Sequence, residues 1–350
     1  MLPDRPAQAS SPWSRVLRRP LPLPRWTLLI GISLFSCGEP EAPQSEPDPI
    51  AELRALNAEL DRLDALCFDE ALDPSQRALA CSDSRRAQNL PRLVLIQLGL
   101  TEIPEQLIER GDHIRDLYLG SNKLRQLPRT IGSLRQLEEL DLSDNQIAKL
   151  PNEIGSLESL SRLALDRNEL TELPEDIGRL ASLRFLRLTR NRLSALPDVL
   201  AGLQSLEYLD ISGNLFTELP AAIPKLPALR VLDLSDNPLP EIPAELTELS
   251  TLEALVAREL GLRALPSWLG RASSLKVLNV SDNALTELPP ELASLPHLES
   301  VNAADNRIHS LSPAWCRIQR IELSGNPLTY ESFRQQCDER AASSPTGTAD

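Results

Sequence analysis

The 350-residue chain is poor in the residues on which catalysis and metal binding usually depend. It contains three His, five Cys and one Met, and only 3% of its residues are aromatic. The three histidines, at positions 113, 297 and 309, do not accompany a nucleophilic Ser or Cys and a carboxylate in any recognisable motif. We also find no phosphate-binding loop, kinase signature or metal-ligand spacing. The sequence therefore predicts no enzyme activity, no cofactor and no metal site.

Basic residues are fewer than acidic ones. The chain has 36 Lys and Arg against 50 Asp and Glu, a net charge of −14. The first 36 residues carry five Arg and one Asp, which leaves −18 for the remainder. Nucleic-acid binding depends on neutralising phosphates with basic side chains, so this balance disfavours a nucleic-acid partner. It equally disfavours docking of the folded body on anionic lipid.

Long hydrophobic runs are missing as well. The apolar run in the leader, residues 26–35, is too short to span a membrane but suits the core of a signal peptide, and it follows Arg15, Arg18, Arg19 and Arg25. The run ends in Leu34-Phe35-Ser36-Cys37, which resembles the lipobox of bacterial lipoproteins. That resemblance implies cleavage after residue 36 and lipidation of Cys37. An uncleaved anchor or a chance apolar stretch is the alternative.

Two further segments precede the main body of the chain. Residues 37–50 are rich in Pro and acidic residues, which cannot build a core and predict an extended tether. Residues 51–89 contain apolar residues at three- and four-residue intervals, which predict a helical N-terminal cap. Those residues are Leu53, Leu56, Leu60, Leu63 and Cys67.

One repeat fills the chain from residue 90 to 328. The pattern L-x-x-L-x-L-x-x-N-x-L occurs eleven times, and its clear copies begin 23 residues apart, as at Leu137 and Leu160. The alternating apolar positions predict a short half-buried strand in each copy. A fixed period of this length indicates a solenoid, in which each coil stacks on its neighbours.

Asn and Pro recur at fixed points between the strands. Pro closes the turn in most copies, and the x-x-I-G-x-L that follows predicts one helical or 3₁₀ turn on the outer face. A buried amide needs partners, so we expect a ladder of hydrogen bonds from each Asn to the backbone of its own and the adjacent coil. Leu98 and Leu260 interrupt that ladder, and Leu260 marks either a local irregularity or a tolerated apolar substitution. The Asn residues are Asn122, Asn145, Asn168, Asn191, Asn214, Asn237, Asn283, Asn306 and Asn326.

These repeats resemble the leucine-rich repeat family, in a variant found in bacterial proteins and in animal Ras-pathway scaffolds. The resemblance covers about two-thirds of the chain. It implies an α/β solenoid shaped as a horseshoe, with a parallel sheet on the concave side and short helical or 3₁₀ turns on the convex side. We therefore expect eleven repeats over 90–328, a C-terminal cap over 329–340 and a disordered tail over 341–350.

Four cysteines flank the array in two local pairs. End coils expose an apolar face and need caps. Members of the family outside the cytoplasm often close their ends with disulfide-bonded caps, so the resemblance implies the pairings Cys67–Cys81 and Cys316–Cys337. Neither pair has the spacing of a zinc or redox site. Free buried thiols are the alternative.

The resemblance also predicts where a partner would bind. The third and fifth positions of L-x-x-L-x-L point into the concave face, where Phe185 and Tyr208 occupy the same position in neighbouring coils. Aromatic residues and Arg are the types most enriched at interface hot spots. The alternative is that these are ordinary surface residues. The predicted partner-binding residues, over coils four to seven, are Arg162, Phe185, Arg187, Tyr208, Asp210 and Asp233.

Together these features predict a non-catalytic, monomeric binding module for a protein or peptide, held on the bacterial envelope by its lipid alone. Gly38 is not the Asp associated with retention in the inner membrane, which favours the outer membrane. One alternative is an intracellular scaffold whose N-terminus has been misread. Another is a structural or adhesive envelope protein without a specific partner.

Overall fold

The computed structural model describes residues 71–87, 90–318 and 320–343. Within them, eleven three-residue strands form one parallel sheet in chain order. The strands are β1 Arg92–Val94, β2 Asp116–Tyr118, β3 Glu139–Asp141, β4 Arg162–Ala164, β5 Phe185–Arg187, β6 Tyr208–Asp210, β7 Val231–Asp233, β8 Ala254–Val256, β9 Val277–Asn279, β10 Ser300–Asn302 and β11 Arg320–Glu322. The predicted solenoid and its eleven coils are confirmed.

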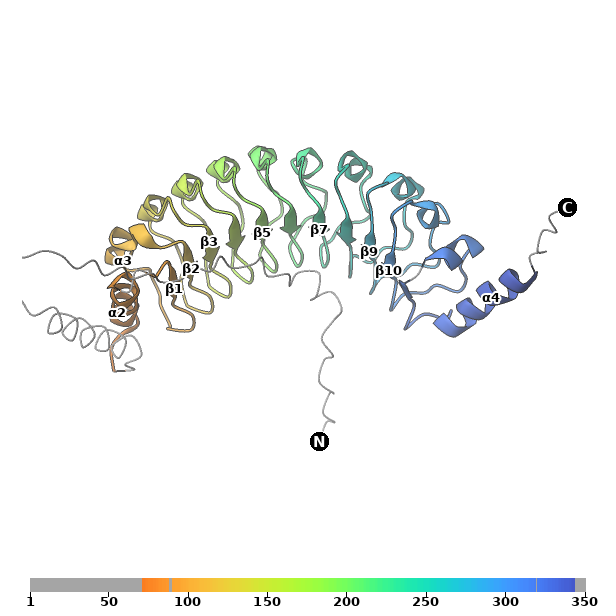
Figure 1. Cartoon of the computed structure of the whole chain (residues 1–350), viewed down its shortest axis with the longest axis horizontal. Coiled ribbons are helices and arrows are strands. Elements are labelled where there is room, and N and C mark those ends of the chain that lie inside the picture. The colour runs from red at the N-terminus through yellow and green to blue at the C-terminus, as the bar shows by residue number, and fades with distance from the viewer. Residues whose placement is uncertain (1–70, 88–89, 319, 344–350) are drawn as a thin grey trace, which may run out of the picture. The chain divides into compact units, whose positions relative to one another are not determined.

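The register of the sheet follows the repeat. Each strand residue pairs with the residue at the same repeat position next door, as Phe185 does with Tyr208 and Tyr208 with Val231. Equivalent side chains therefore form rows that run across the strands. The coils curve with the strands on the inner side of the array (Figure 1).

Short turns cover the outer side of the array (Figure 1). The first coil has the helix α3 Glu105–Glu109 and the 3₁₀ turn η2 Gly111–His113, and later coils have 3₁₀ turns alone. A Cβ on Gly155 would collide with the carbonyl oxygen of Asp176, so glycine allows adjacent turns to stack closely. The later turns are η3 Arg129–Ser133, η4 Asn152–Ser156, η5 Glu175–Arg179, η6 Asp198–Gly202, η7 Ile223–Lys225, η8 Ala244–Glu248, η9 Ser267–Arg271, η10 Leu292–Ser294 and η11 Pro313–Arg317.

The core is a continuous stack of aliphatic side chains between the sheet and the outer turns. In the fifth coil Leu183, Leu186 and Leu188 are fully buried, and Ile177 reaches the same core from the turn before them. Because every coil supplies the same positions, the core has no interior boundary along the array. Burying these side chains is the main stabilising contribution to each coil.

The Asn ladder forms as predicted. Asn145 illustrates it: Nδ2 donates to the carbonyl oxygens of Leu119 and Leu142, both 3.0 Å away, and Oδ1 accepts from the backbone N–H of Leu124 at 3.0 Å. One side chain thus satisfies backbone groups of two coils. The same geometry recurs at Asn168, Asn191 and Asn214.

Leu260 interrupts the ladder without disturbing the coil. It is buried, and β8 pairs in register with both of its neighbours. Its backbone N–H donates to Oδ1 of Asn283 in the next coil at 3.1 Å, and the same oxygen accepts from Leu262 at 3.0 Å. The substitution is therefore a tolerated apolar residue rather than an irregularity.

The N-terminal end of the array is covered by the helix α2 Pro74–Ala87. Ala78 and Cys81 are buried, and Arg77 donates to the carbonyl oxygen of Leu98 at 3.1 Å. This bond falls where Leu98 replaces the first Asn of the ladder. Cys81 is disulfide-bonded. Its predicted partner Cys67, together with the predicted apolar face over residues 53–67, lies outside the described residues.

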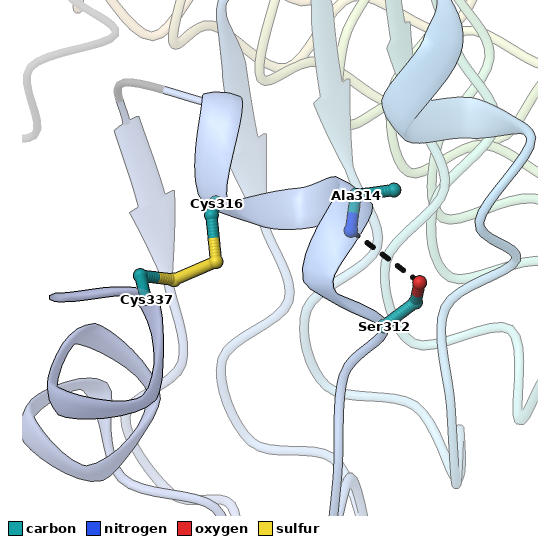
Figure 2. The surroundings of a disulfide bond; sticks show 4 residues. All are labelled: Ser312, Ala314, Cys316 and Cys337. Atoms are coloured by element: carbon teal, nitrogen blue, oxygen red, sulfur yellow. Dashed lines mark hydrogen bonds between the residues drawn. A yellow bond between two sulfur atoms is a disulfide. The ribbon is translucent and has the colours of Figure 1, made fainter. Parts of the chain in front are cut away.

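The C-terminal end is covered by the helix α4 Tyr330–Ser343. A disulfide joins Cys337 in this helix to Cys316 in η11, where Ser312 accepts a hydrogen bond from the N–H of Ala314 (Figure 2). Phe333 is buried against the last coil. The helix extends to residue 343, so residues 341–343, expected in a disordered tail, belong to it. Two of these three residues are Ala, the strongest helix former.

Candidate partner-binding surface

An apolar row crosses the concave side of the sheet. It consists of the first residue of each strand from β5 to β9. All five side chains are half-buried, and none is needed to fill the core beneath the sheet. The members of this apolar row are Phe185, Tyr208, Val231, Ala254 and Val277. With strands about 4.8 Å apart, the row is about 19 Å long.

Its bulkiest part lies over β4 to β6. The rings of Phe185 and Tyr208 have centroids 6.1 Å apart and are tilted by 32°. The Arg162 guanidinium lies 5.2 Å from the Phe185 ring centroid on the other side, and it also pairs with Glu139 at 3.7 Å. Cation–π and aromatic contacts of this kind hold the three side chains as one surface. The structure thus brings together Arg162, Phe185 and Tyr208, three of the residues that the sequence predicted for partner binding.

The two predicted acids have a structural role that the sequence did not reveal. Oδ1 of Asp210 accepts from the N–H of Ser212 at 3.0 Å, and Oδ1 of Asp233 accepts from the N–H of Ser235 at 2.9 Å. Each carboxylate therefore stabilises the turn that follows its own strand. Asn279 does the same for Ser281 at 3.1 Å. Turn formation therefore explains why this position carries a carboxylate or an amide in these coils.

The electrostatics of these strands follow from burial. Burial, together with the neighbouring negative charge of Asp210, raises the pKa of Asp233 to about 6. Burial also raises the pKa of Tyr208, helped by the negative charges of both carboxylates. The phenol therefore stays protonated and donates to Oδ2 of Asp210 at 3.4 Å.

Arg187 is held by an ion pair that the sequence pattern did not predict. Its guanidinium forms an ion pair with the buried carboxylate of Asp166, which also accepts from the N–H of Thr189 at 3.1 Å. Burial raises the pKa of Asp166, and the charge of Arg187 opposes that shift. In most other coils the residue two positions before the ladder position is Ser, Thr or Gly. An Asp at this position, as at residue 166, could therefore have been recognised from the sequence as an exception.

A depression of about 310 Å³ lies beside this pair, and we call it the arginine depression. Its acids are already paired, Asp166 with Arg187 and Asp144 with Arg167 at 3.3 Å. Arg190 makes no ion pair with any residue that the structure describes. The lining residues are Ser143, Asp144, Asp166, Arg167, Arg187, Thr189 and Arg190.

A glycine in the neighbouring coil leaves room for the side chain of Arg190. Arg190 has a left-handed φ of 54°, as do the equivalent residues of most coils. The equivalent residue in the next coil is Gly213, where a Cβ would lie 2.9 Å from Cγ of Arg190. The glycine therefore accommodates both its own φ of 65° and the stem of the neighbouring arginine.

The repeats match known sequence families. Residues 97–183 and 173–260 match the model described as "Leucine-rich repeat region", and residues 273–315 match "Leucine Rich repeats (2 copies)". The chain belongs to the leucine-rich repeat family. A comparison with curated proteins finds no match.

Solved leucine-rich repeat structures share the fold. YopM, a leucine-rich effector protein from Yersinia pestis, is 25% identical, with 79% of this chain and 71% of that chain aligned at a TM-score of 0.58. The ectodomain of the Arabidopsis thaliana receptor kinase GASSHO1/SCHENGEN3, solved with CASPARIAN STRIP INTEGRITY FACTOR 2, is 26% identical. There 72% of this chain aligns with 34% of that one at a TM-score of 0.55. The chain thus spans about a third of that ectodomain.

The leucine-rich repeat solenoid presents an extended surface for binding. Among the described residues, no three His, Cys, Asp or Glu side chains are grouped so that they could hold a metal ion. None of the helices in the described ranges has the length and apolar character needed to cross a membrane. The concave face, with its apolar row and its arginine depression, is the surface best suited to a partner.

Proposed function

We propose that the chain is a non-catalytic leucine-rich repeat module that binds a protein or peptide on its concave face. The observation that carries the proposal is the apolar row, with Phe185 and Tyr208 in contact and Arg162 over the Phe185 ring. A sheet face that only covered a core would not need five adjacent apolar residues on its solvent side. The complex of the related plant ectodomain with its factor supports this choice of partner class.

The proposal can be tested by cross-linking from within the surface. A photoreactive phenylalanine analogue replaces Tyr208, and a second variant carries it at Arg271 in η9 on the outer side. We expect covalent adducts in cells only from position 208, and we expect them to disappear when Phe185→Ala is added. Equal adduct formation from both positions, or adducts indifferent to Phe185→Ala, would refute a concave binding surface.

We further propose that the module is a monomer, cleaved after residue 36, lipidated at Cys37 and held at the bacterial outer membrane. The basic leader, its short apolar core and the acidic Pro-rich tether support the anchor. The disulfide between Cys316 and Cys337 supports an oxidising compartment, since such bonds are rare in the cytosol.

Mass spectrometry of the intact protein tests this anchor. We expect material extracted from membranes to begin at Cys37 and to carry added acyl mass, and a Cys37→Ser variant to lose that mass. An unmodified chain that starts at Met1 and has free thiols at 316 and 337 would instead identify an intracellular scaffold.

A further inference from the structure

Charge changes sign along the edge of the sheet where the strands end. The residues immediately before each ladder position lie in the turns at this edge. In coils four and five they are Arg167 and Arg190, and the sixth coil has Gly213. In the next four coils they are all acidic, namely Asp236, Glu259, Asp282 and Asp305. Because parallel strands all end at the same edge, these turns form one row beside the concave face.

Local pairing leaves Arg190 and Asp236 free on either side of Gly213, and Asp305 in the tenth coil also forms no ion pair among the described residues. Arg258 neutralises part of the acidic stretch, since it lies 2.9 Å from Asp282 and 3.7 Å from Glu259. Asp236 forms no ion pair among the described residues, and it is exposed. In the arginine depression the corresponding unpaired group is Arg190.

The apolar row runs alongside both charges. Arg190 follows β5, which carries Phe185, and Asp236 follows β7, which carries Val231 and Asp233. Two strand spacings separate the two coils, about 10 Å, which equals the rise of about three residues of an extended chain. A chain laid along the apolar row would therefore pass a cation and then an anion about three residues apart.

We infer that the partner presents an extended peptide segment across the strands. A carboxylate of this segment binds Arg190, apolar side chains lie on the row from Phe185 toward Val277, and a Lys or Arg about three residues from the carboxylate binds Asp233 and Asp236. The inference rests on the proposed function and adds the charge pattern of the ligand. Complementary charges select a partner and its register more than they raise affinity.

The repeats supply substitutions that the backbone already accepts. Arg190, Asp236 and Glu259 have φ angles of 54°, 52° and 54° at equivalent positions. Arg190→Glu thus places at coil five the residue type that coil eight carries, and Asp236→Arg places at coil seven the type that coil five carries. Arg271→Glu in η9 is the matched control, because Arg271 is exposed on the outer side.

The probes are fluorescein-labelled twelve-residue peptide libraries with alternating Leu or Val, measured by fluorescence polarisation against the full chain. Two libraries fix a mixed pair, Asp-x-x-Lys or Lys-x-x-Asp, so that both chain directions are covered. Two others fix Asp-x-x-Asp or Lys-x-x-Lys. We expect at least one mixed library to bind wild type about tenfold more tightly than either uniform one.

The variants should then redirect this preference. Arg190→Glu should favour Lys-x-x-Lys, Asp236→Arg should favour Asp-x-x-Asp, and the double variant should again favour a mixed pair. Arg271→Glu should change nothing. Absence of a charge preference, or of any binding, overturns the inference. If the adducts from position 208 persist in that case, the proposed function stands without it, and if they are lost as well, both fail.

Discussion

The carboxylate of Asp233 accepts a hydrogen bond from the backbone N–H of Ser235 at 2.9 Å while it lies beside the carboxylate of Asp210 on the next strand. The first contact holds the turn, and the second contributes to the raised pKa of Asp233. The Asp233 side chain therefore stabilises its turn and is at the same time repelled by the Asp210 carboxylate. Another coil of the repeat keeps the hydrogen bond without the repulsion, because the uncharged Asn279 accepts from the N–H of Ser281 at the equivalent position.

Asp233→Asn should stabilise the protein at neutral pH. The folded pKa of about 6 exceeds the ordinary value of 3.8, so the folded state binds a proton more readily and loses stability as pH rises from about 4 to 6. Asn cannot ionise, so the variant does not lose this stability as the pH rises. The difference in the free energy of unfolding can reach about 3 kcal/mol, from a pKa shift of about two units at about 1.4 kcal/mol per unit. Urea melts at pH 7.5 and pH 4 should show the gain only at pH 7.5. Asp236→Asn, at an exposed residue, is the control, and an equal gain at both pH values would contradict the argument.

Leu186→Ala should destabilise the array by about 2–5 kcal/mol, because it leaves a cavity in the continuous core. Leu186 is fully buried, whereas Ser182 is exposed in the loop before the same strand. Ser182→Ala should therefore cost less than about 0.5 kcal/mol. The measurement is the urea midpoint of each variant. Coinciding midpoints would mean that the inward positions of the repeat have been assigned wrongly.

Asn145→Leu tests how much the ladder contributes. It leaves the N–H of Leu124 and the carbonyl oxygens of Leu119 and Leu142 without this partner, at a cost of about 2–4 kcal/mol from buried unpaired groups. Gln146→Leu, one residue on and exposed, is the matched control. The free energy of unfolding should fall for Asn145→Leu alone. If both changes are neutral, the ladder is dispensable in the coil of Asn145 as well as at Leu260.

The double change Phe185→Ala and Tyr208→Ala should weaken partner binding by more than about 2 kcal/mol, the usual threshold for a hot spot. The melting temperature should change little, since both side chains lie on the solvent side of the sheet. Calorimetry with the cross-linked partner, once purified, measures the affinity. Arg271→Ala in η9 is the control, because Arg271 is exposed on the outer side of the array. Unchanged affinity for the double variant would move the binding surface elsewhere.

The sequence by itself determined the fold. A 23-residue period places the same side chain at the same point of every coil, so leucines must face inward together and strand residues must align in rows. For the same reason the Asn ladder and the contact between Phe185 and Tyr208 were predictable. A residue that departs from its repeat position, such as Asp166, can be identified in the sequence, but its ion pair with Arg187 could not be predicted from the repeat.

Only the tertiary structure decided which polar groups remain available. Arg187 and Arg190 look alike in the sequence, yet Asp166 pairs with the first and no described acid pairs with the second. Likewise Asp210 and Asp233 are partly engaged by their own turns. Ion pairs and hydrogen bonds depend on side-chain separations of less than 4 Å between neighbouring coils. A repeat pattern fixes the backbone positions, but the directions of long side chains follow from packing.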